Sequence, residues 1–358
     1  MPWIFKIELL MQEIKNNKET HLVNMDALRA IAVIGVVAHH TKAVTGFSIP
    51  FIGDYGGLLG VELFFIISGF LITESACRSN LRKYVIHRLF RIFPAYWFTY
   101  LLLGIPAGIF LKADQDWWAF FLNLVNLQQL SPKALIAYDV LHVTWTLTVE
   151  LIWYFIAPLF ILGKARWALW WLAASLVIST CWSFFAAQGY FNAWFADGFA
   201  SLQNPADPGQ VGIIINNAFP AQMFFFIFGG CIYFYKDFFF RINETVINAT
   251  IIALLLLIGV YQGKLPSPIF LTGIGLGALL IKVLRAPPTK DKILPRIGKI
   301  SYSIYLVHFP IIIFFAQKFS GSLGNISIAL GYLTIFIVSN VVYELIEKKF
   351  IAIGRKLS

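Results

Sequence analysis

Charged residues are scarce in this sequence. Asp, Glu, Lys and Arg together make up 13% of the 358 residues, whereas a soluble domain carries roughly 25%. Hydrophobic residues reach 59%, which leaves too little polar surface to cover a protein that faces water. The composition therefore excludes a soluble globular protein and predicts a chain that crosses a membrane several times.

Cysteine is also rare. Cys77, Cys181 and Cys231 stand alone, and no C-x-x-C or comparable spacing occurs. This excludes a disulfide framework and the usual zinc-binding patterns, and we expect no metal cofactor. The first 24 residues mix polar and charged side chains without an apolar core before a cleavage site, so we expect no cleavable signal peptide.

Apolar segments of about 20 residues, the length that crosses a bilayer as a helix, recur along the chain. We predict an all-α polytopic membrane protein with about ten transmembrane helices at 26–45, 57–77, 92–111, 144–163, 167–187, 216–235, 244–262, 266–284, 301–317 and 326–346. The stretch 117–130 is apolar but short, and we predict an interfacial or re-entrant segment there. The predicted organisation is a cytoplasmic segment at 1–24, one transmembrane domain at 25–346 and a cytoplasmic tail at 347–358, with a long outer loop at 188–215.

The distribution of basic residues supports this topology. With the N-terminus inside, 22 of the 28 Lys and Arg residues fall in inside segments and 5 in outside segments. Such a bias is what the positive-inside rule requires, and it places both termini in the cytoplasm. Making 117–130 a full span would move the basic cluster at 282–299 outside, so we reject it. The net charge of +10 thus reflects topology, and we expect no nucleic-acid partner.

Two charged or titratable side chains stand inside the first predicted span. Arg29 and His40 are eleven residues apart in "MDALRAIAVIGVVAHH". On a helix their directions differ by ~20° and they lie ~16 Å apart along the axis. Charges in hydrocarbon are costly and usually mark function, although a snorkelling arginine and a structural histidine would also fit.

Further polar groups interrupt the second span and the segment after it. Glu62 and Ser68 occur in "GVELFFIISGFLIT", where an unpaired carboxylate would be costly. Arg88 and Arg91 share one helix face in "RKYVIHRLFRIFPAYW". Paired guanidinium groups suit phosphates, although anchoring at the cytoplasmic interface explains such arginines as well.

Two later spans also carry polar side chains. Trp145 and Glu150 lie near the start of a span in "HVTWTLTVELIWYFIAP", and Tyr302, Tyr305 and His308 recur at three-residue intervals in "ISYSIYLVHFP". An ion pair between helices and an aromatic packing stripe are the structural alternatives.

These five stretches, in this order, resemble the integral-membrane acyltransferase-3 family, the group that contains the bacterial O-antigen and exopolysaccharide O-acetyltransferases. The resemblance covers residues 25 to about 310, and its strength lies in the order of the motifs rather than in any one of them. The family's Arg-x10-His pattern falls on Arg29 and His40, and its paired arginines fall on Arg88 and Arg91. Its Trp-x-Leu-x-x-Glu pattern ends at Glu150. Where Glu62 stands, the family often has Asp.

The resemblance implies transfer of an acyl group from cytoplasmic acyl-CoA, most commonly acetyl-CoA, to an acceptor carried on lipid at the outer leaflet. The acceptor would be a cell-surface glycan such as O-antigen of lipopolysaccharide, capsule or exopolysaccharide, and the site would be the bacterial inner membrane. Many members carry a C-terminal SGNH-type domain, which does not follow before Ser358, so we expect any larger machinery to be another protein.

The resemblance also implies roles for single residues. His40 would be the general base, Glu150 would orient its ring, and Arg29 would mark the cytoplasmic end of the same path. An acyl group carried transiently on His40 is an open variant. The remaining expectations are donor contacts from Arg88, Arg91 and Ser68, and acceptor or acyl contacts from Glu62, Trp145, Tyr302 and His308.

Two other interpretations stay open at this point. A proton-coupled transporter of a sugar or lipid-linked substrate would also bury His, Glu and Arg, although no repeat between the two halves is visible. A different membrane-bound O-acyltransferase fold could use His308 as its histidine, but the order of the motifs argues against it.

Overall fold

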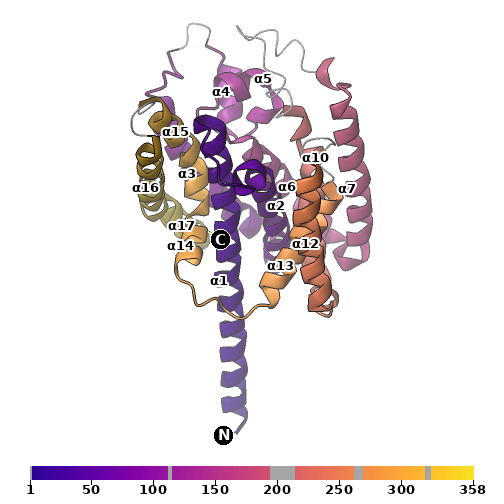
Figure 1. The fold of residues 1–358 in the computed structure, drawn as a ribbon. Coiled ribbons are helices and arrows are strands. Elements are labelled where there is room, and N and C mark those ends of the chain that lie inside the picture. Colours follow the sequence, from indigo (N-terminus) through magenta and orange to yellow (C-terminus); the bar gives the residue numbers. More distant parts are fainter. Residues whose placement is uncertain (1, 112–114, 194–213, 262–268, 319–323) are drawn as a thin grey trace.

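The computed structural model describes residues 2–111, 115–193, 214–261, 269–318 and 324–358, and within these ranges the secondary structure is helical without strands. Residues 194–213, most of the predicted outer loop, lie outside the described part. The helices run roughly side by side in one bundle (Figure 1). The fold class predicted from the sequence is therefore confirmed.

The helices and turns of the described residues follow one another in a simple order along the chain. They are α1 (Pro2–Thr45), α2 (Ile52–Arg78), α3 (Leu81–Gly104), α4 (Trp117–Leu124), the 3-10 turn η1 (Gln128–Leu130), α5 (Pro132–Ala137), α6 (Trp145–Leu162), α7 (Lys164–Ala187), α10 (Phe219–Phe234), α11 (Lys236–Phe239), α12 (Glu244–Tyr261), α13 (Ile269–Arg285), α14 (Ile293–Lys299), α15 (Ser301–Lys318), α16 (Gly324–Val342), the π-helical turn η2 (Tyr343–Glu347) and α17 (Lys348–Lys356).

Each of the ten predicted spans coincides with one of these helices, but fewer meet the length and apolarity of a membrane crossing on their own. Six do so in the described residues, and the pair α14 and α15, bent by 78° at its break, adds a seventh only if the two helices form one span. The six are Val23–Thr45, Ile52–Arg78, Trp145–Leu162, Lys164–Ala187, Ile214–Phe234 and Ile326–Lys356. These are the helices of an integral membrane protein, while the count of ten stays a prediction.

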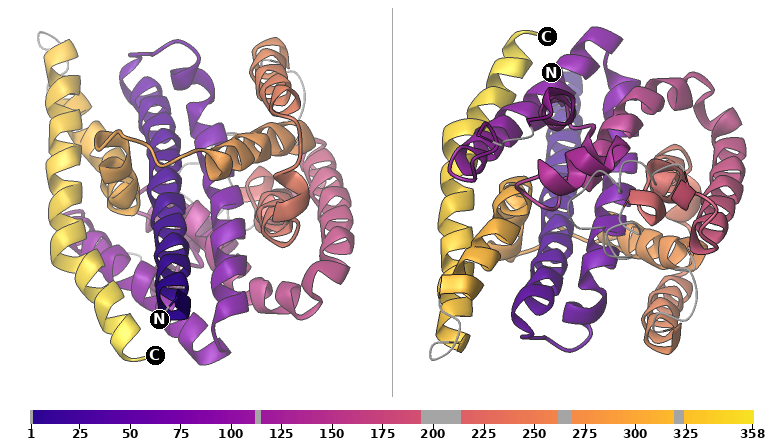
Figure 2. Two further views of the ribbon diagram at one scale, coloured as in Figure 1. Left: turned by 90° about the horizontal axis from the view of Figure 1, so that it is seen from below. Right: turned by 90° about the horizontal axis from the view of Figure 1, so that it is seen from above.

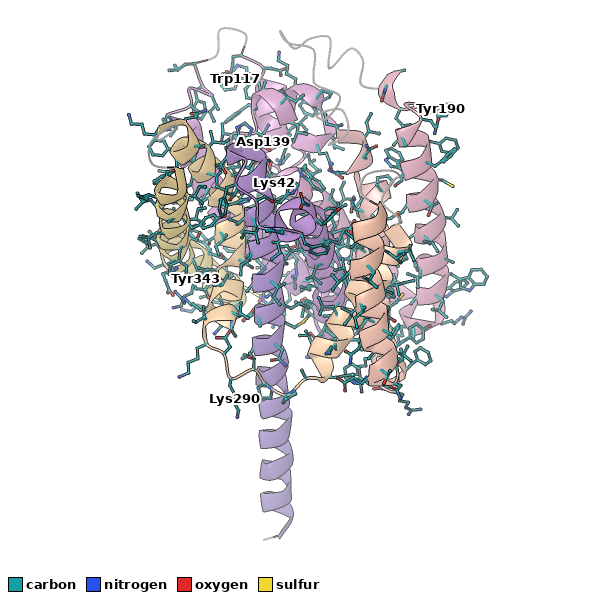
Figure 3. All side chains as sticks on the ribbon, viewed as in Figure 1. Lys42, Trp117, Asp139, Tyr190, Lys290 and Tyr343 are labelled. Carbon is teal, nitrogen blue, oxygen red and sulfur yellow. The ribbon has the colours of Figure 1, made fainter. Side chains whose placement is uncertain are left out.

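α1 is longer than predicted. It begins at Pro2 and continues to Thr45, so the predicted boundary at residue 25 lies inside a continuous helix. The part apolar enough to span begins at Val23, and the N-terminal part projects from the bundle (Figure 1). Lys290 lies toward this end of the bundle, whereas Trp117 and Tyr190 lie at the other (Figure 3). The N-terminus and the basic loop thus share one end, as the charge bias requires, although which side that end faces stays a prediction.

The segment 117–130 does not cross the bundle. It forms the eight-residue helix α4, whose first turn is capped by Asp116, followed by the short turn η1. Buried amides tie this segment down: Asn123 Nδ2 donates to the Ala134 carbonyl at 2.8 Å, and Gln128 Nε2 donates to the Thr144 carbonyl at 3.0 Å. The prediction that 117–130 is not a full span is confirmed.

Close helix contacts place α2 at the centre of the bundle, between α1 and α10. An added Cβ on Gly69 would lie 2.0 Å from the Phe226 carbonyl oxygen, and one on Gly229 would lie 2.0 Å from that of Ile66. Small residues let membrane helices approach in this way. Figure 2 shows α1 and α2 in the middle, with α16 and α17 at one edge and α7 at the opposite edge. The central position of α2 lets it contribute residues to the cavity described next.

Candidate active site

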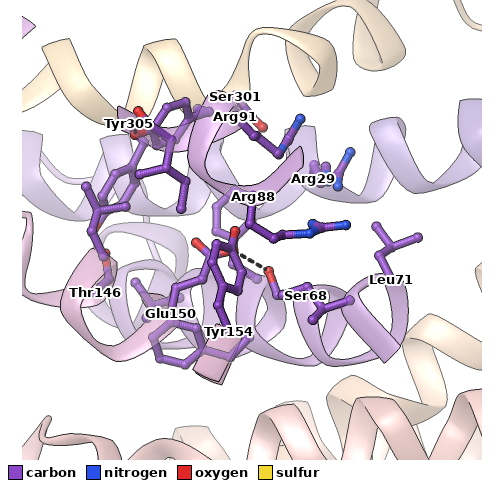
Figure 4. A pocket seen from close by; sticks show the side chains of 17 residues that line it. Arg29, Ser68, Leu71, Arg88, Arg91, Thr146, Glu150, Tyr154, Ser301 and Tyr305 are labelled. Carbon is purple, nitrogen blue, oxygen red and sulfur yellow. Dashed lines mark hydrogen bonds between the residues drawn. The ribbon is translucent and has the colours of Figure 1, made fainter. Parts of the chain in front are cut away.

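A cavity of about 90 Å³ that opens to the outside lies between α1, α2, α3, α6 and α15. Its polar lining consists of Arg29, Ser68, Arg88, Arg91, Thr146, Glu150, Tyr154, Ser301, Tyr302 and Tyr305, and aliphatic and Phe side chains complete it. Thr146 and Tyr305 lie at one end and Arg29 and Leu71 at the other (Figure 4). Six of the ten residues predicted for the site therefore meet in one place: Arg29, Ser68, Arg88, Arg91, Glu150 and Tyr302.

Two of the arginines come from α3. Asn80 is the N-cap of this helix, and its side chain accepts a hydrogen bond from the backbone N–H of Lys83 at 2.8 Å. Arg88 and Arg91 follow on one face, as their spacing predicts. The guanidinium of Arg88 lies over the rings of Tyr84 and Tyr154, at 5.8 and 5.6 Å from the centroids. Among the described residues its buried Nε has no hydrogen-bond partner.

The third arginine comes from α1. Arg29 donates from Nη1 to Oδ1 of Asp26 at 3.1 Å, with 21% of its side chain exposed. Its charge interacts with that of Arg91, so like charges are held close together. Three guanidinium groups thus line one cavity, and guanidinium groups are side chains that suit phosphate oxygens.

Glu150 lies in the same cavity as the arginines. Its Oε1 accepts hydrogen bonds from Ser68 Oγ at 3.1 Å and from the Tyr154 hydroxyl at 2.9 Å. His40 does not belong to the lining of this cavity. Glu150 thus faces Ser68 and Tyr154, and the structure does not bring it together with His40 in this cavity.

The partner of His40 is His308. Nδ1 of His40 lies 2.8 Å from Nε2 of His308, and the two rings stack with centroids 5.0 Å apart. His308 is fully buried in α15, and the ring of Phe309 stands edge-on to His40. A helix-spacing argument places two side chains on one face of one helix, but it does not predict this contact between helices.

Tyr305 connects the cavity to this histidine pair. Its hydroxyl accepts a hydrogen bond from Thr146 Oγ1 and donates one to the Val143 carbonyl, both at 2.7 Å. Its ring lines the cavity and lies 5.6 Å from the ring of His308, one helical turn further along α15. The cavity thus ends one turn from the pair formed by His40 and His308.

Glu62 and Trp145 do not line this cavity, and the acceptor or acyl contacts expected of them stay predictions. Val61 and Phe65 of α2 do line it, whereas Glu62 points to another face and is buried against Thr272 of α13, with 1% of its surface exposed. Trp145 packs edge-on against Phe65, at 6.4 Å between ring centroids. Tyr302 does line the cavity, but its hydroxyl already donates to the Ile92 carbonyl at 2.9 Å.

Four polar residues of the cavity lining were not predicted for the site: Thr146, Tyr154, Ser301 and Tyr305. Glu347, outside this lining, was missed as well. Tyr154 and Thr146 stand four residues either side of Glu150, and this helical spacing was the available signal for a shared face. Glu347 is buried in the π-helical turn η2, accepts a hydrogen bond from Ser303 Oγ at 2.8 Å and interacts with the charge of Arg91. Nothing in the sequence predicts a π-helical turn there, although such turns are frequent at functional sites.

Within the part of the chain that the structure describes, no group of three or more His, Cys, Asp or Glu side chains is arranged to hold a metal ion.

Comparison with known proteins finds relatives among bacterial O-acetyltransferases. A stretch of 169 residues is 28% identical to the peptidoglycan O-acetyltransferase OatA of Listeria monocytogenes, covering 41% of this chain and 25% of that protein. A stretch of 163 residues is 31% identical to the O-acetyltransferase OatA of Staphylococcus aureus, covering 39% of this chain and 25% of that protein. The match thus spans about a quarter of the length of these relatives, and no solved structure matches the chain. A family model described as an acyltransferase domain matches residues 22–344, nearly the whole chain, and the protein therefore belongs to the acyltransferase-3 family of integral-membrane acyltransferases.

Proposed function

We propose that the protein is a membrane O-acetyltransferase that takes its acetyl group from cytoplasmic acetyl-CoA and transfers it to a hydroxyl of a cell-envelope glycan. The names of both relatives support O-acetyl transfer. The location proposed with it is the bacterial inner membrane, where a cytoplasmic thioester and an outward-facing glycan can be reached by one protein.

The observation that carries this proposal is the arginine-lined cavity. Coenzyme A bears about four negative charges in its phosphate groups, and Arg29, Arg88 and Arg91 gather three positive charges around one opening. The unpartnered Nε of Arg88 is a hydrogen-bond donor available to a phosphate oxygen. A transporter of a neutral sugar would gain nothing from this arrangement, so the cavity favours a phosphorylated donor.

The position of the histidine pair fits the reach of such a donor. Arg29 and His40 lie on one helix, eleven residues apart, which corresponds to ~16 Å along its axis. If the phosphates bind at the arginines, the pantetheine arm extends past Glu150 and Tyr305 toward the pair. The thioester then meets His40, where an acceptor arriving from the other side of the membrane can also reach it.

In the proposed reaction the acceptor hydroxyl attacks the thioester carbon. His40 takes the hydroxyl proton as the carbon–oxygen bond forms, and the carbon–sulfur bond breaks to release CoA. The proton then passes from His40 to the leaving sulfur, so the products are an O-acetyl ester and free CoA thiol. A positioned base of this kind contributes about 10² to 10⁴ in rate.

We propose a cell-envelope glycan as the acceptor and do not assign a particular one. Peptidoglycan, named for the Listeria relative, and the O-antigen or exopolysaccharide acceptors implied by the family are the candidates. Each offers sugar hydroxyls at the outer face of the membrane.

The test uses the purified full chain in detergent and acetyl-CoA as the probe. Calorimetry gives the affinity, and a thiol reagent gives the rate of CoA release with peptidoglycan fragments, with O-antigen oligosaccharides and without acceptor. We expect wild-type protein to bind acetyl-CoA and release CoA faster with one acceptor. His40→Ala should bind with unchanged affinity and lose release about 10²-fold or more. Folded wild-type protein that binds no acetyl-CoA, or a fully active His40→Ala variant, would overturn the proposal.

A further inference from the structure

The ring of His308 also contacts backbone carbonyls of its own helix, and these contacts determine which ring nitrogens of the pair carry protons. His308 Nδ1 lies 2.8 Å from the carbonyl oxygen of Tyr305 and 3.2 Å from that of Ile304, while its Nε2 lies 2.8 Å from Nδ1 of His40. A row of hydrogen bonds thus runs from the backbone carbonyl through His308 to His40. In this row, the donor or acceptor role of each group determines the role of the next.

A carbonyl oxygen can only accept a hydrogen bond, so Nδ1 of His308 must carry a proton. A neutral imidazole carries one N–H, which leaves Nε2 of His308 as an acceptor. The short contact with His40 then requires Nδ1 of His40 to be the donor. The remaining ring nitrogen of His40, Nε2, is left without a proton.

We propose that His308 is a positioning residue that holds His40 in the Nδ1–H tautomer, so that Nε2 of His40 is the atom that accepts the acceptor's proton. This inference rests on the proposed function for the reaction itself, but the tautomer follows from the contacts alone. It gives His308 the orienting role that the sequence assigned to Glu150.

The burial of His308 supports the neutral state on which the tautomer assignment depends, and His40 beside it is half-buried. His308 is 0% exposed, and an ionised group without a charged partner is costly in such a place. The groups that face the pair are the rings of His39, Phe309 and Tyr305 and the carbonyls of α15. None of these is an anion, so none of them stabilises an imidazolium before the reaction begins.

The first experiment reads the tautomer directly. Wild-type protein is prepared with ¹⁵N-labelled histidine, and the signals of His40 among the six histidines are identified by their loss in His40→Gln. Protonated and unprotonated ring nitrogens differ widely in ¹⁵N shift, so the proton on each can be assigned. We expect His40 to carry its proton on Nδ1, the tautomer that histidine disfavours in water. A proton on Nε2 of His40 in the folded wild-type protein would overturn the proposal without any variant.

A matched pair of variants tests whether His308 sets this state. The amide of His308→Gln reaches the position of Nε2, and its oxygen can still accept from His40. The amide of His308→Asn reaches only the position of Nδ1, so the acceptor is lost at nearly the same polarity and size. We expect His40 to keep the Nδ1–H tautomer in His308→Gln and to lose it in His308→Asn.

The loss of activity should be larger in His308→Asn than in His308→Gln. A wrong tautomer in a catalytic histidine lowers kcat by about 10⁴ in a serine protease, so we expect His308→Asn to lower kcat by about 10² or more. KM for acetyl-CoA should stay within about twofold of wild type, and His308→Gln should recover most of the activity. Unchanged tautomer in folded His308→Asn, or equal losses in both variants, would show that His308 has only a packing role.

The two proposals fail in different ways. If the protein does not transfer acetyl groups, the ¹⁵N spectra still report the tautomer of His40. If transfer occurs but His40 carries its proton on Nε2, the proposed function stands and the role of His308 is wrong.

Discussion

Ser68 on α2 donates a hydrogen bond of 3.1 Å to Glu150 on α6, joining two helices across 82 residues of sequence. The bond connects the arginine-lined cavity to the centre of the bundle, because both side chains line the cavity and α2 is packed between α1 and α10.

This contact should be visible as an energetic coupling. We expect Ser68→Ala and Glu150→Gln each to lower the free energy of unfolding in mixed micelles, and the double variant to lose less than the sum. Residues in one hydrogen-bond network typically couple by 0.5–3 kcal/mol. Ser75→Ala combined with Glu150→Gln is the control, since Ser75 is on α2 but does not line the cavity, and its effect should be additive. Additivity for Ser68 as well would contradict the hydrogen bond.

The arginine cavity makes a prediction about donor affinity. Hydrogen bonds to charged groups contribute about 1.5–3 kcal/mol, so we expect Arg88→Ala to raise KM for acetyl-CoA about 10- to 100-fold. Arg88→Lys should fall in between, because a lysine keeps the charge but loses the planar guanidinium and its stacking on the two tyrosines. Steady-state kinetics over a range of acetyl-CoA concentrations would measure this.

Arg82→Ala provides the matched control for Arg88→Ala. Arg82 lies on the same helix and is exposed outside the cavity, so its loss removes one positive charge from the same region. We expect KM to change less than about twofold. Equal changes in KM for both variants would mean that general surface charge attracts the donor.

The contact between α2 and α10 predicts a strong effect of one methyl group. A Cβ on Gly69 would lie 2.0 Å from a backbone oxygen, whereas one on Gly331 in α16 would find its nearest neighbour at 3.7 Å. We expect Gly69→Ala to destabilise the protein by about 1–3 kcal/mol or more, as overpacking does, and to lower the yield of folded protein. Gly331→Ala should be neutral or slightly stabilising. Thermal unfolding in detergent would distinguish them, and equal stability would show that the helices are not in close contact.

The cap of α4 should respond to acid. Asp116 accepts the backbone N–H of Ala119, which holds the pKa of this carboxyl below its usual range, and burial opposes this effect. Lys133 lowers the same pKa further through Nζ, 3.4 Å from Oδ2. A carboxyl with a lowered pKa stabilises the fold fully above its unfolded value of about 3.9, and this contribution disappears as pH falls through the folded value.

Hydrogen exchange of the Trp118 and Ala119 amides, corrected for intrinsic rates, measures this contribution. We expect wild-type protection to decrease below about pH 4. Asp116→Asn keeps a capping oxygen that does not titrate, so its protection should vary less in that range. An identical pH dependence in the two proteins would contradict the proposed role of the carboxylate.

The sequence predicted well what depends on a single helix. The spacing of Arg88 and Arg91 placed both on one face of α3, and that face does line the cavity. The ten apolar segments overlap helices, and six of the helices in the described residues are long and apolar enough to cross a membrane. Apolar length and local hydrogen bonding largely determine such a helix.

What the sequence could not predict is how one helix is rotated toward the next. Glu62 and Ser68 occur in one motif, yet Ser68 faces the cavity and Glu62 faces Thr272 of α13. The contact between His40 and His308 likewise depends on the packing of α1 against α15. Such contacts are fixed by the shapes of whole helix surfaces rather than by residue spacing within one span.

α15 contacts both the arginine-lined cavity and His40, so it connects the proposed donor site to the proposed acceptor site. It starts immediately after the 78° bend that follows α14. Its residues Ser301, Tyr302 and Tyr305 line the cavity, and its His308 contacts His40 of α1. On the proposed function, a donor whose binding shifts α15 would also move the residue proposed to hold His40. Donor binding at one end would then be linked to acceptor binding at the other, and by reciprocity an acceptor bound beside His40 would change the affinity for the donor by the same factor.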